Sequence, residues 1–292
     1  MYKWLHGPYD AGMEGRGYSR IGDELMKWKF ALAAIFAAGL ILAEAPCAQI
    51  EEVDNGHTLY DIPPRTLVDM PTAGTLPRGT FNIGLRLYAQ GGALGYTDIG
   101  LSNRLMLGIS YGGIKIVSNE NPDWNPSIAF NLKFRVIDEM EVFPAVTVGF
   151  SDQGYGPFVD DWDRFVFKSR GFYAVTSRSF YFYKWTSSWH FGVNYSREYK
   201  GDDDQDVNIF GGFDATFNYN LALLLEYDAA FNDDSGDRPE ISGKGRGYLN
   251  LSVKWLFAAN LEMEIFAKDL LINRREADTF SRGLRIIYID HF

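Results

Sequence analysis

From Gly79 to the last residue, Phe292, the chain alternates between apolar residues and polar or small ones in short stretches separated by turns. In residues 81–88 and 189–196, every second position is aromatic or aliphatic, whereas the intervening positions include Arg86 and His190. A period of two places successive side chains on opposite faces of a β-strand. The pattern therefore predicts a series of strands, each with one apolar and one polar face.

About twelve such strands can be counted, an even number as in bacterial outer-membrane barrels. They cover residues 80–90, 92–101, 105–116, 127–137, 141–151, 164–177, 187–199, 207–217, 221–231, 247–257, 261–271 and 282–292. Most reach the roughly 9–11 residues that a tilted strand needs to cross a bilayer. We expect an all-β fold, an up-and-down antiparallel transmembrane β-barrel.

The connections between these strands alternate in length. Short turns fall near residues 102–104, 138–140, 178–186, 218–220 and 258–260, and longer connections at 117–126, 152–163, 200–206, 232–246 and 272–281. In outer-membrane barrels the short turns face the periplasm and the long loops face outward. Both ends of the barrel domain are therefore expected on the periplasmic side.

A soluble β-sandwich or jelly roll is the alternative architecture, since it also contains many short strands. The barrel is favoured because one face is polar or small in strand after strand, as at Asn131, Lys133 and Arg135 or at Asn250, Ser252 and Lys254. The opposite face is aliphatic or aromatic throughout, as expected for contact with lipid.

The amino-terminal region reads as an export signal. Basic residues in Met26–Lys29 precede a 14-residue apolar run, Phe30–Ala43, and small residues lead to a cleavage site placed after Ala48. The alternatives are a membrane anchor, for which the run is short, and lipidation at Cys47. We therefore expect residues 1–25 to be a non-native upstream extension and 26–48 a signal peptide. A proline-rich lead-in, 49–79, would lie in the periplasm or in the lumen, and residues 80–292 would form the barrel.

Charge and composition exclude several classes of function. The formal net charge is −10, which argues against a nucleic-acid partner. The one cysteine, Cys47, lies in the signal, so neither disulfides nor thiol chemistry is expected. No His or Cys spacing suits a metal, and no cofactor is expected. The acidic run Asp202–Asp206 is interpreted as a solvated turn, or as carboxylates bridged by divalent ions to lipopolysaccharide, rather than as a dedicated calcium loop.

Charged residues of both signs share the inward parity of the strands. The candidates for lining the lumen are Arg86, Lys133, Arg135, His190, Glu198, Asp214, Glu226, Asp228, Lys254, Glu262 and Glu264. Buried charges need partners, so the favoured interpretation is an internal network of ion pairs that fills a narrow barrel. The alternative is a polar conduit whose charges select solutes.

No catalytic constellation is evident from the spacing of residues, and the protein is expected not to be an enzyme. His190 is interpreted as a hydrogen-bonded lumen residue, because no serine–histidine–acid grouping can be assembled from spacing alone. In the long loop 152–163, Tyr155, Phe158 and Trp162 are candidates for contact with a ligand. The aromatic run Phe180–Trp185 suits the interfacial girdle of a barrel better than a sugar-binding platform.

The carboxyl terminus and the lipid-facing surface predict two kinds of partner. A final phenylalanine on the last strand resembles the signal read by the barrel-assembly machinery, although Asp290 stands where an aromatic residue is usual. The apolar face predicts contact with outer-membrane lipid and lipopolysaccharide of a Gram-negative bacterium.

Several motifs resemble the YjbH-like outer-membrane barrels, a family associated with exopolysaccharide production. They are Met70–Gly79, Gly108–Gly113, Phe143–Ala145, Gly149–Phe150, Gln153–Gly156, Lys168–Val175 and Gly192–Tyr195. The longer family members exceed this chain in length, so the resemblance is to a single-barrel member. It implies a role in exporting or retaining a surface polysaccharide, with polysaccharide as a partner, and it brings no catalytic residues.

Three functions follow as hypotheses. The first is a non-enzymatic barrel for exopolysaccharide export or surface polysaccharide production, or for passage of small polar solutes. The second is an outer-membrane enzyme acting on lipid or envelope glycan. The third is a structural or adhesive scaffold whose acidic outer loops bind surface polymer or ions.

Overall fold

Twelve long antiparallel strands close into a barrel in the computed structural model, which describes residues 63–182, 185–217, 220–235 and 241–292. The wall strands are β1 (Thr80–Tyr88), β2 (Gly92–Ser102), β3 (Leu105–Ile114), β5 (Ala129–Ile137), β6 (Ala145–Ser151), β9 (Gly171–Phe182), β10 (Trp185–Tyr195), β11 (Asn208–Phe217), β12 (Leu221–Asp228), β13 (Tyr248–Ala258), β14 (Leu261–Lys268) and β15 (Ser281–His291). The predicted fold class is confirmed.

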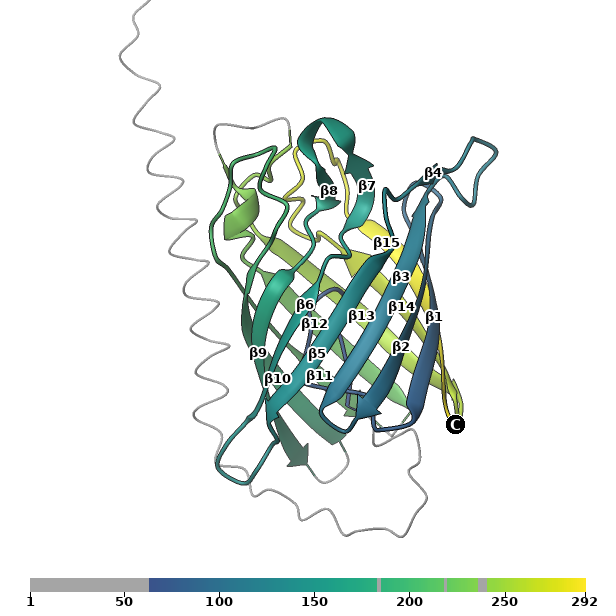
Figure 1. The fold of residues 1–292 in the computed structure, drawn as a ribbon, viewed down its shortest axis with the longest axis vertical. Coiled ribbons are helices and arrows are strands. Elements are labelled where there is room, and N and C mark those ends of the chain that lie inside the picture. Colours follow the sequence, from purple (N-terminus) through teal and green to yellow (C-terminus); the bar gives the residue numbers. More distant parts are fainter. Residues whose placement is uncertain (1–62, 183–184, 218–219, 236–240) are drawn as a thin grey trace, which may run out of the picture.

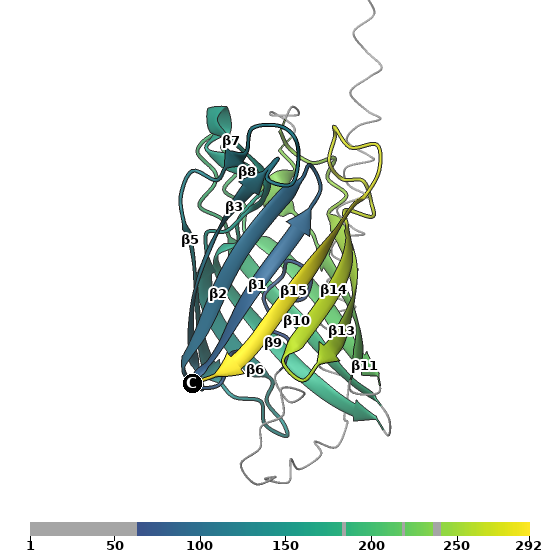
Figure 2. The ribbon, with the colours of Figure 1, turned by 90° about the vertical axis from the view of Figure 1, so that its right-hand side faces the viewer.

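The barrel closes where its first and last strands meet. β1 pairs with β2 on one side and with β15 on the other, with Thr80 opposite His291 and Leu87 opposite Leu284 (Figure 2). Each other wall strand pairs with its neighbours in the order of the chain. A closed ladder leaves no strand edge without hydrogen bonds, which is what a hydrocarbon environment requires.

The two faces of the strands separate as the alternation predicts. Ile83, Phe130 and Ile265 on the outside are 56%, 57% and 67% exposed, whereas Arg86 and Lys133 on the inside are 2% and 1% exposed. An apolar exterior around a polar interior is the arrangement of an outer-membrane barrel. Among the described residues, no helix is long and apolar enough to cross a membrane.

The two ends of the barrel differ (Figure 1). The short turns and the carboxyl terminus lie at one end, here called the short-turn end, and the longer connections lie at the other, the long-loop end. The long-loop end also carries β4 (Asp123–Trp124), the hairpin of β7 (Tyr155–Val159) and β8 (Arg164–Phe167), and two single 3-10 turns, η2 (Asp160–Trp162) and η3 (Phe231–Asp233).

One strand differs from the sequence expectation of 164–177. Residues 164–167 form β8, which pairs with β7 above the barrel, and the wall strand β9 begins only at Gly171. Gly171 has φ +61°, a left-handed conformation that separates the hairpin from the wall. Similarly, β6 begins at Ala145 rather than at residue 141, because Pro144 has no N–H to give to a ladder.

Exposed aromatic side chains gather where β9, β10 and β11 approach the short-turn end. Phe182 stacks on Trp185 with ring centroids 4.1 Å apart, and Trp185 lies 6.1 Å from Phe217. All three are at least 39% exposed. This placement suits an interfacial girdle.

The predicted upstream extension (1–25), the signal peptide (26–48) and residues 49–62 of the lead-in lie outside the described residues. The rest of the lead-in, residues 63–79, runs inside the barrel.

Candidate functional site: a plug in the barrel lumen

The segment before β1 fills the middle of the lumen, and we call residues Arg65–Leu76 the plug. All of them except Thr66 are buried, and Leu67, Val68 and Met70 expose no surface at all. Met70 packs against Tyr173, Val175 and Phe210 of the wall. The described part of the lead-in is therefore in the lumen, the second of the two locations left open by the sequence.

The plug is a tight hairpin closed by its own backbone. The Leu67 N–H donates to the Met70 carbonyl at 2.8 Å, which places Val68 and Asp69 at the tip, and the Thr72 N–H donates to the Arg65 carbonyl at 3.1 Å. At the base, a Cβ on Gly74 would lie 2.4 Å from the Pro64 carbonyl oxygen, so only glycine allows the two arms to meet there.

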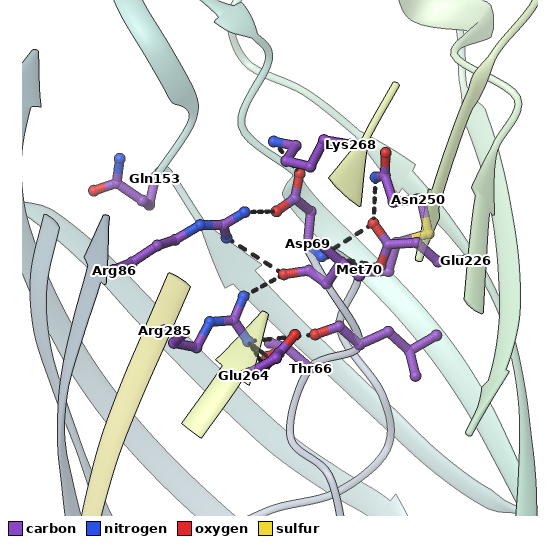
Figure 3. A network of polar contacts seen from close by, with 12 residues as sticks. Thr66, Asp69, Met70, Arg86, Gln153, Glu226, Asn250, Glu264, Lys268 and Arg285 are labelled. Carbon is purple, nitrogen blue, oxygen red and sulfur yellow. Dashed lines mark hydrogen bonds and ion pairs between the residues drawn. The ribbon is translucent and has the colours of Figure 1, made fainter. Parts of the chain in front are cut away.

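Side chains from opposite sides of the wall hold the tip (Figure 3). Glu226 of β12 accepts the N–H groups of Asp69 at 2.9 Å and Met70 at 3.0 Å. Arg86 of β1 and Arg285 of β15 both donate to the Val68 carbonyl. Buried backbone groups need partners, so these wall side chains replace the water that the tip excludes.

The Asp69 carboxylate is the centre of a buried ion-pair network. It binds Arg86 at 2.6 Å and also contacts the ammonium of Lys268. Two further contacts brace the wall groups: Arg285 pairs with Glu264 at 3.1 Å, and Asn250 donates to Glu226 at 2.6 Å. Each charge thus has a partner of opposite sign or a hydrogen bond, as burial demands.

A second group of wall residues holds the base of the plug. The ammonium of Lys133 donates to the carbonyls of Thr72 at 3.0 Å and Gly74 at 3.1 Å, and also to that of Arg65. Arg135 Nε and Thr147 Oγ1 both donate to the Ala73 carbonyl at 3.1 Å. Lys133 and Arg135, expected from parity to line the lumen, therefore bind backbone oxygens of the plug.

A serine–histidine–aspartate row crosses three adjacent strands beside the plug. Ser177 Oγ lies 2.7 Å from His190 Nδ1, and His190 Nε2 lies 2.8 Å from Asp214 Oδ1. The plug's Ala73 N–H donates to Ser177 Oγ at 2.8 Å. Ser177 and His190 are directly opposite on β9 and β10, a register that spacing along the chain does not reveal.

The remaining lumen candidates lie in smaller contacts. Asp228 pairs with Arg170 at 2.5 Å, and Lys254 lies 3.6 Å from Glu262. Glu198 was expected to line the lumen on a strand reaching residue 199, and this expectation is wrong. The strand β10 ends at Tyr195, because its partner β9 begins only at Gly171 and pairs Phe172 with Tyr195.

Glu198 lies in the loop after β10 and braces the hairpin instead of lining the lumen. It accepts the N–H groups of Phe165 at 2.9 Å and Ser169 at 3.1 Å. Burial raises the pKa of the Glu198 carboxyl.

The long-loop end is tied together by a second ion-pair cluster. The fully buried Arg164 binds Asp202 at 2.5 Å and Asp233 at 2.9 Å, and Lys168 binds Asp202 at 2.7 Å. The first carboxylate of the acidic run therefore neutralises buried cations, contrary to its interpretation as part of a solvated turn. No group of three or more potential metal ligands occurs among the described residues.

The three aromatic candidates for ligand contact are half-buried. Tyr155 turns into the lumen, with the Arg86 guanidinium 4.1 Å and the Lys268 ammonium 4.7 Å from its ring centre. Phe158 packs edge-on against Phe165 at 5.1 Å. Trp162 lies in η2, and its carbonyl oxygen is so near Gly201 that a Cβ on that residue would lie 2.2 Å from it.

The sequence reasoning missed the plug contacts, Ser177 and Arg170. Parity pointed to the wall side chains, but no local signal shows that Val68 and Asp69 form the tip of a buried turn. The nearest signal is the spacing of Pro63, Pro64 and Pro71, which prevents this segment from joining a strand ladder.

Residues 65–162 match the sequence model of the family described as "Exopolysaccharide biosynthesis protein YbjH". Over these residues the chain is similar to this family. The match includes the plug, the wall from β1 to β6, and β7, and it confirms the resemblance over the motifs from Met70–Gly79 to Gln153–Gly156. Among curated proteins, none matches the chain significantly.

Among solved structures, the chain is similar to a KdgM porin, with 11% identity over 73% of this chain and 99% of that one and a TM-score of 0.43. A COG4313 outer membrane channel from Pseudomonas putida F1 gives 14% identity over 74% and 97% of the chains, with a TM-score of 0.41. The Acinetobacter baumannii outer membrane protein Omp33 gives 9% identity over 73% of this chain and 98% of that one, with a TM-score of 0.43.

Proposed function

We propose that this YjbH-like protein is a non-enzymatic, plugged outer-membrane barrel that acts in surface polysaccharide production, and that a polar chain passes through it only when the plug is released. The plug carries the proposal. Wall residues on both sides hold its tip and base, so the resting lumen has no room for a polymer. We also propose that the protein contacts polysaccharide, outer-membrane lipid, lipopolysaccharide and the barrel-assembly machinery directly.

A plug held by polar contacts is suited to release. Glu226, Lys133 and Arg285 bind the plug through its backbone, and those backbone groups can exchange the wall for water when the plug leaves. If the plug never left the lumen, apolar contacts would hold it as well as the polar ones do, since replacing buried ion pairs with apolar side chains is often neutral or stabilising.

A crosslink between plug and wall tests the proposal. Met70 of the plug packs against Val175 of β9, so Met70→Cys with Val175→Cys places two thiols close together across the plug boundary. Apart from Cys47 in the predicted signal, the chain has no cysteine that would compete. Each single cysteine variant is the matched control.

Two measurements follow. In planar bilayers, the crosslinked barrel is expected to stay closed, and reduction of the crosslink should restore any opening seen in the wild type. In a strain lacking the gene, the wild type and both single variants should restore surface polysaccharide, whereas the crosslinked protein should not. Full restoration by the crosslinked protein would instead indicate a scaffold that acts through its outer surface.

A hydrolase is a second candidate, because Ser177, His190 and Asp214 have the residue types of a catalytic triad. Two contacts count against it. The Ser177 hydroxyl already accepts the Ala73 N–H, and all three side chains are buried beneath the plug. The row therefore fits better as an anchor for the plug.

A further inference from the structure

Three connections at the long-loop end of the barrel border a cavity of about 210 Å³ (Figure 1). Its described lining comes from the β7–β8 hairpin, from the connection between β12 and β13 and from the connection between β14 and β15, and it includes no plug residue. About 10–15 Å³ of such space holds one water molecule, so the cavity has room for about a dozen waters or for one sugar unit.

The two long connections beside the cavity are fixed to each other through their backbones. The Lys244 N–H donates to the Asn273 carbonyl at 2.7 Å, and Gly243 forms an isolated bridge with Arg274. The Asp269 carboxylate accepts the N–H groups of Asn273 at 2.6 Å and Arg274 at 3.1 Å. The backbone that carries the cavity lining is therefore held in place before any ligand arrives, which lowers the entropic cost of binding.

Two arginines that follow one another in the chain, Arg274 and Arg275, line the cavity. Arg275 is exposed and Arg274 is half-buried. Within the described parts of the chain, neither guanidinium donates a hydrogen bond or pairs with a carboxylate, and that of Arg274 lies 5.5 Å from the centre of the Phe167 ring. Because a free guanidinium binds a carboxylate through two parallel hydrogen bonds, these side chains can receive an acidic ligand from solvent.

The other lining residues suit a sugar better than a bare anion. Trp162 is half-buried and lines the cavity, and an indole offers a broad apolar surface to the ring of a ligand. Glu276 is exposed, and its carboxylate accepts hydrogen bonds from hydroxyl groups. The cavity thus combines donors for an acidic group, an acceptor for hydroxyls and an aromatic surface.

We infer that this cavity binds a carboxylate-bearing sugar unit of a surface glycan, with its carboxylate at Arg274 and Arg275 and its ring against Trp162. The inference deepens the proposed function and rests on it, because it names the class of glycan that the barrel would handle: one that contains uronic acid residues. Long loops face outward in an outer-membrane barrel, so the site would hold the chain on the outer side of the plug.

Saturation-transfer NMR on the folded protein in detergent, which detects weak ligands, tests the site with D-glucuronate, D-glucose, acetate and a glucose monophosphate. Glucuronate is expected to bind at least about tenfold more tightly than glucose, which lacks the carboxylate, and than acetate, which lacks the ring. Glucose or acetate binding as tightly as glucuronate, or no binding of glucuronate, would overturn the inference. Tighter binding of the phosphate would overturn it in favour of phosphorylated sugars such as those of lipopolysaccharide.

Arg274→Gln combined with Arg275→Gln is expected to lower the affinity for glucuronate about tenfold, to that for glucose, and to leave glucose binding unchanged. Trp162→Leu should weaken glucuronate and glucose alike, because both have the ring. Arg282→Gln, at an exposed arginine of β15 that does not line the cavity, is the matched control and should bind as the wild type does. Equal affinity for all variants would contradict the site, and heat-modifiable migration in gels confirms that each variant is folded.

The crosslinked Met70→Cys, Val175→Cys barrel separates this inference from the proposed function. It should still bind glucuronate, because the cavity lies among the loops and binding needs no release of the plug. Glucuronate binding in a crosslinked protein that still supports polysaccharide production would leave the site standing while the plug-release proposal failed. Absence of glucuronate binding in the wild type, together with a crosslink that blocks polysaccharide production, would overturn the site and leave the plug-release proposal standing.

Discussion

Glu226 accepts the backbone N–H of Asp69 with both carboxylate oxygens, at 3.0 and 2.9 Å, and so joins β12 to the tip of a plug 157 residues earlier in the chain. The same carboxylate accepts the Met70 N–H. Charge-assisted hydrogen bonds from two successive backbone groups to one wall residue make Glu226 the main contact on its side of the tip.

Glu226→Ala is therefore expected to loosen the plug. It leaves two buried N–H groups without an acceptor, at about 1–3 kcal/mol each, which would raise the population of open barrels by one to two orders of magnitude or more. Channel openings in planar bilayers measure the effect. Glu141→Ala removes an exposed carboxylate at the short-turn end and should conduct like the wild type. Identical traces for the two variants would contradict the role of Glu226.

Lys133→Met should free the base of the plug, because three carbonyl oxygens lose the ammonium that they share. Limited digestion with trypsin reports this, since the bond after Arg65 is buried in the wild type. We expect faster cleavage there in the variant, measured by mass spectrometry. Lys115→Met, at an exposed lysine of the β3–β5 loop, is the control. An unchanged cleavage rate for Lys133→Met would contradict this role, because the contacts of Arg135, Thr147 and Ser177 with Ala73 and those at the tip would then hold the plug without Lys133.

Ser177 is expected to resist fluorophosphonate reagents, which label activated serines. Its hydroxyl is occupied by Ala73 and covered by the plug, so the wild type and Ser177→Ala should give the same absence of label. Labelling of the wild type that Ser177→Ala abolishes would favour the hydrolase. Ser177→Ala should also destabilise the plug by about 1 kcal/mol, through one lost hydrogen bond to Ala73.

The hairpin above the barrel should depend on pH through Glu198. Burial raises the pKa of this carboxyl above its ordinary value, so the folded loop holds the proton more tightly than the open loop does. The closed loop is then most stable at low pH and loses stability as the pH rises through the raised pKa. Amide hydrogen exchange at Phe165 and Ser169, corrected for intrinsic rates, should show this loss.

Glu198→Gln is expected to remove that pH dependence, whereas Glu120→Gln, at an exposed carboxylate, should leave it intact. Protection that is independent of pH in the wild type would mean that the hydrogen bonds from Phe165 and Ser169 stabilise the carboxylate enough to offset its burial.

The lumen candidates show how far parity carries a prediction. Arg86, Lys133 and Glu226 were placed inside from their position in alternating strands, and they are inside. Their partners were not predictable, because each bonds to the plug rather than to another strand. Glu198 was misplaced because strand ends depend on where the partner strand begins, here at Gly171.

The sequence by itself determined the wall of this protein. A period-two alternation is a local property of each strand, and a face for lipid on one side and a polar interior on the other favours a closed barrel with short turns at one end over a two-layer sandwich. The tertiary structure alone decided what fills it. The position of Val68 and Asp69 between β1, β12 and β15, and the meeting of Ser177, His190 and Asp214, depend on strand register and barrel closure. Both bring together residues that are distant in the chain and carry no periodic signal.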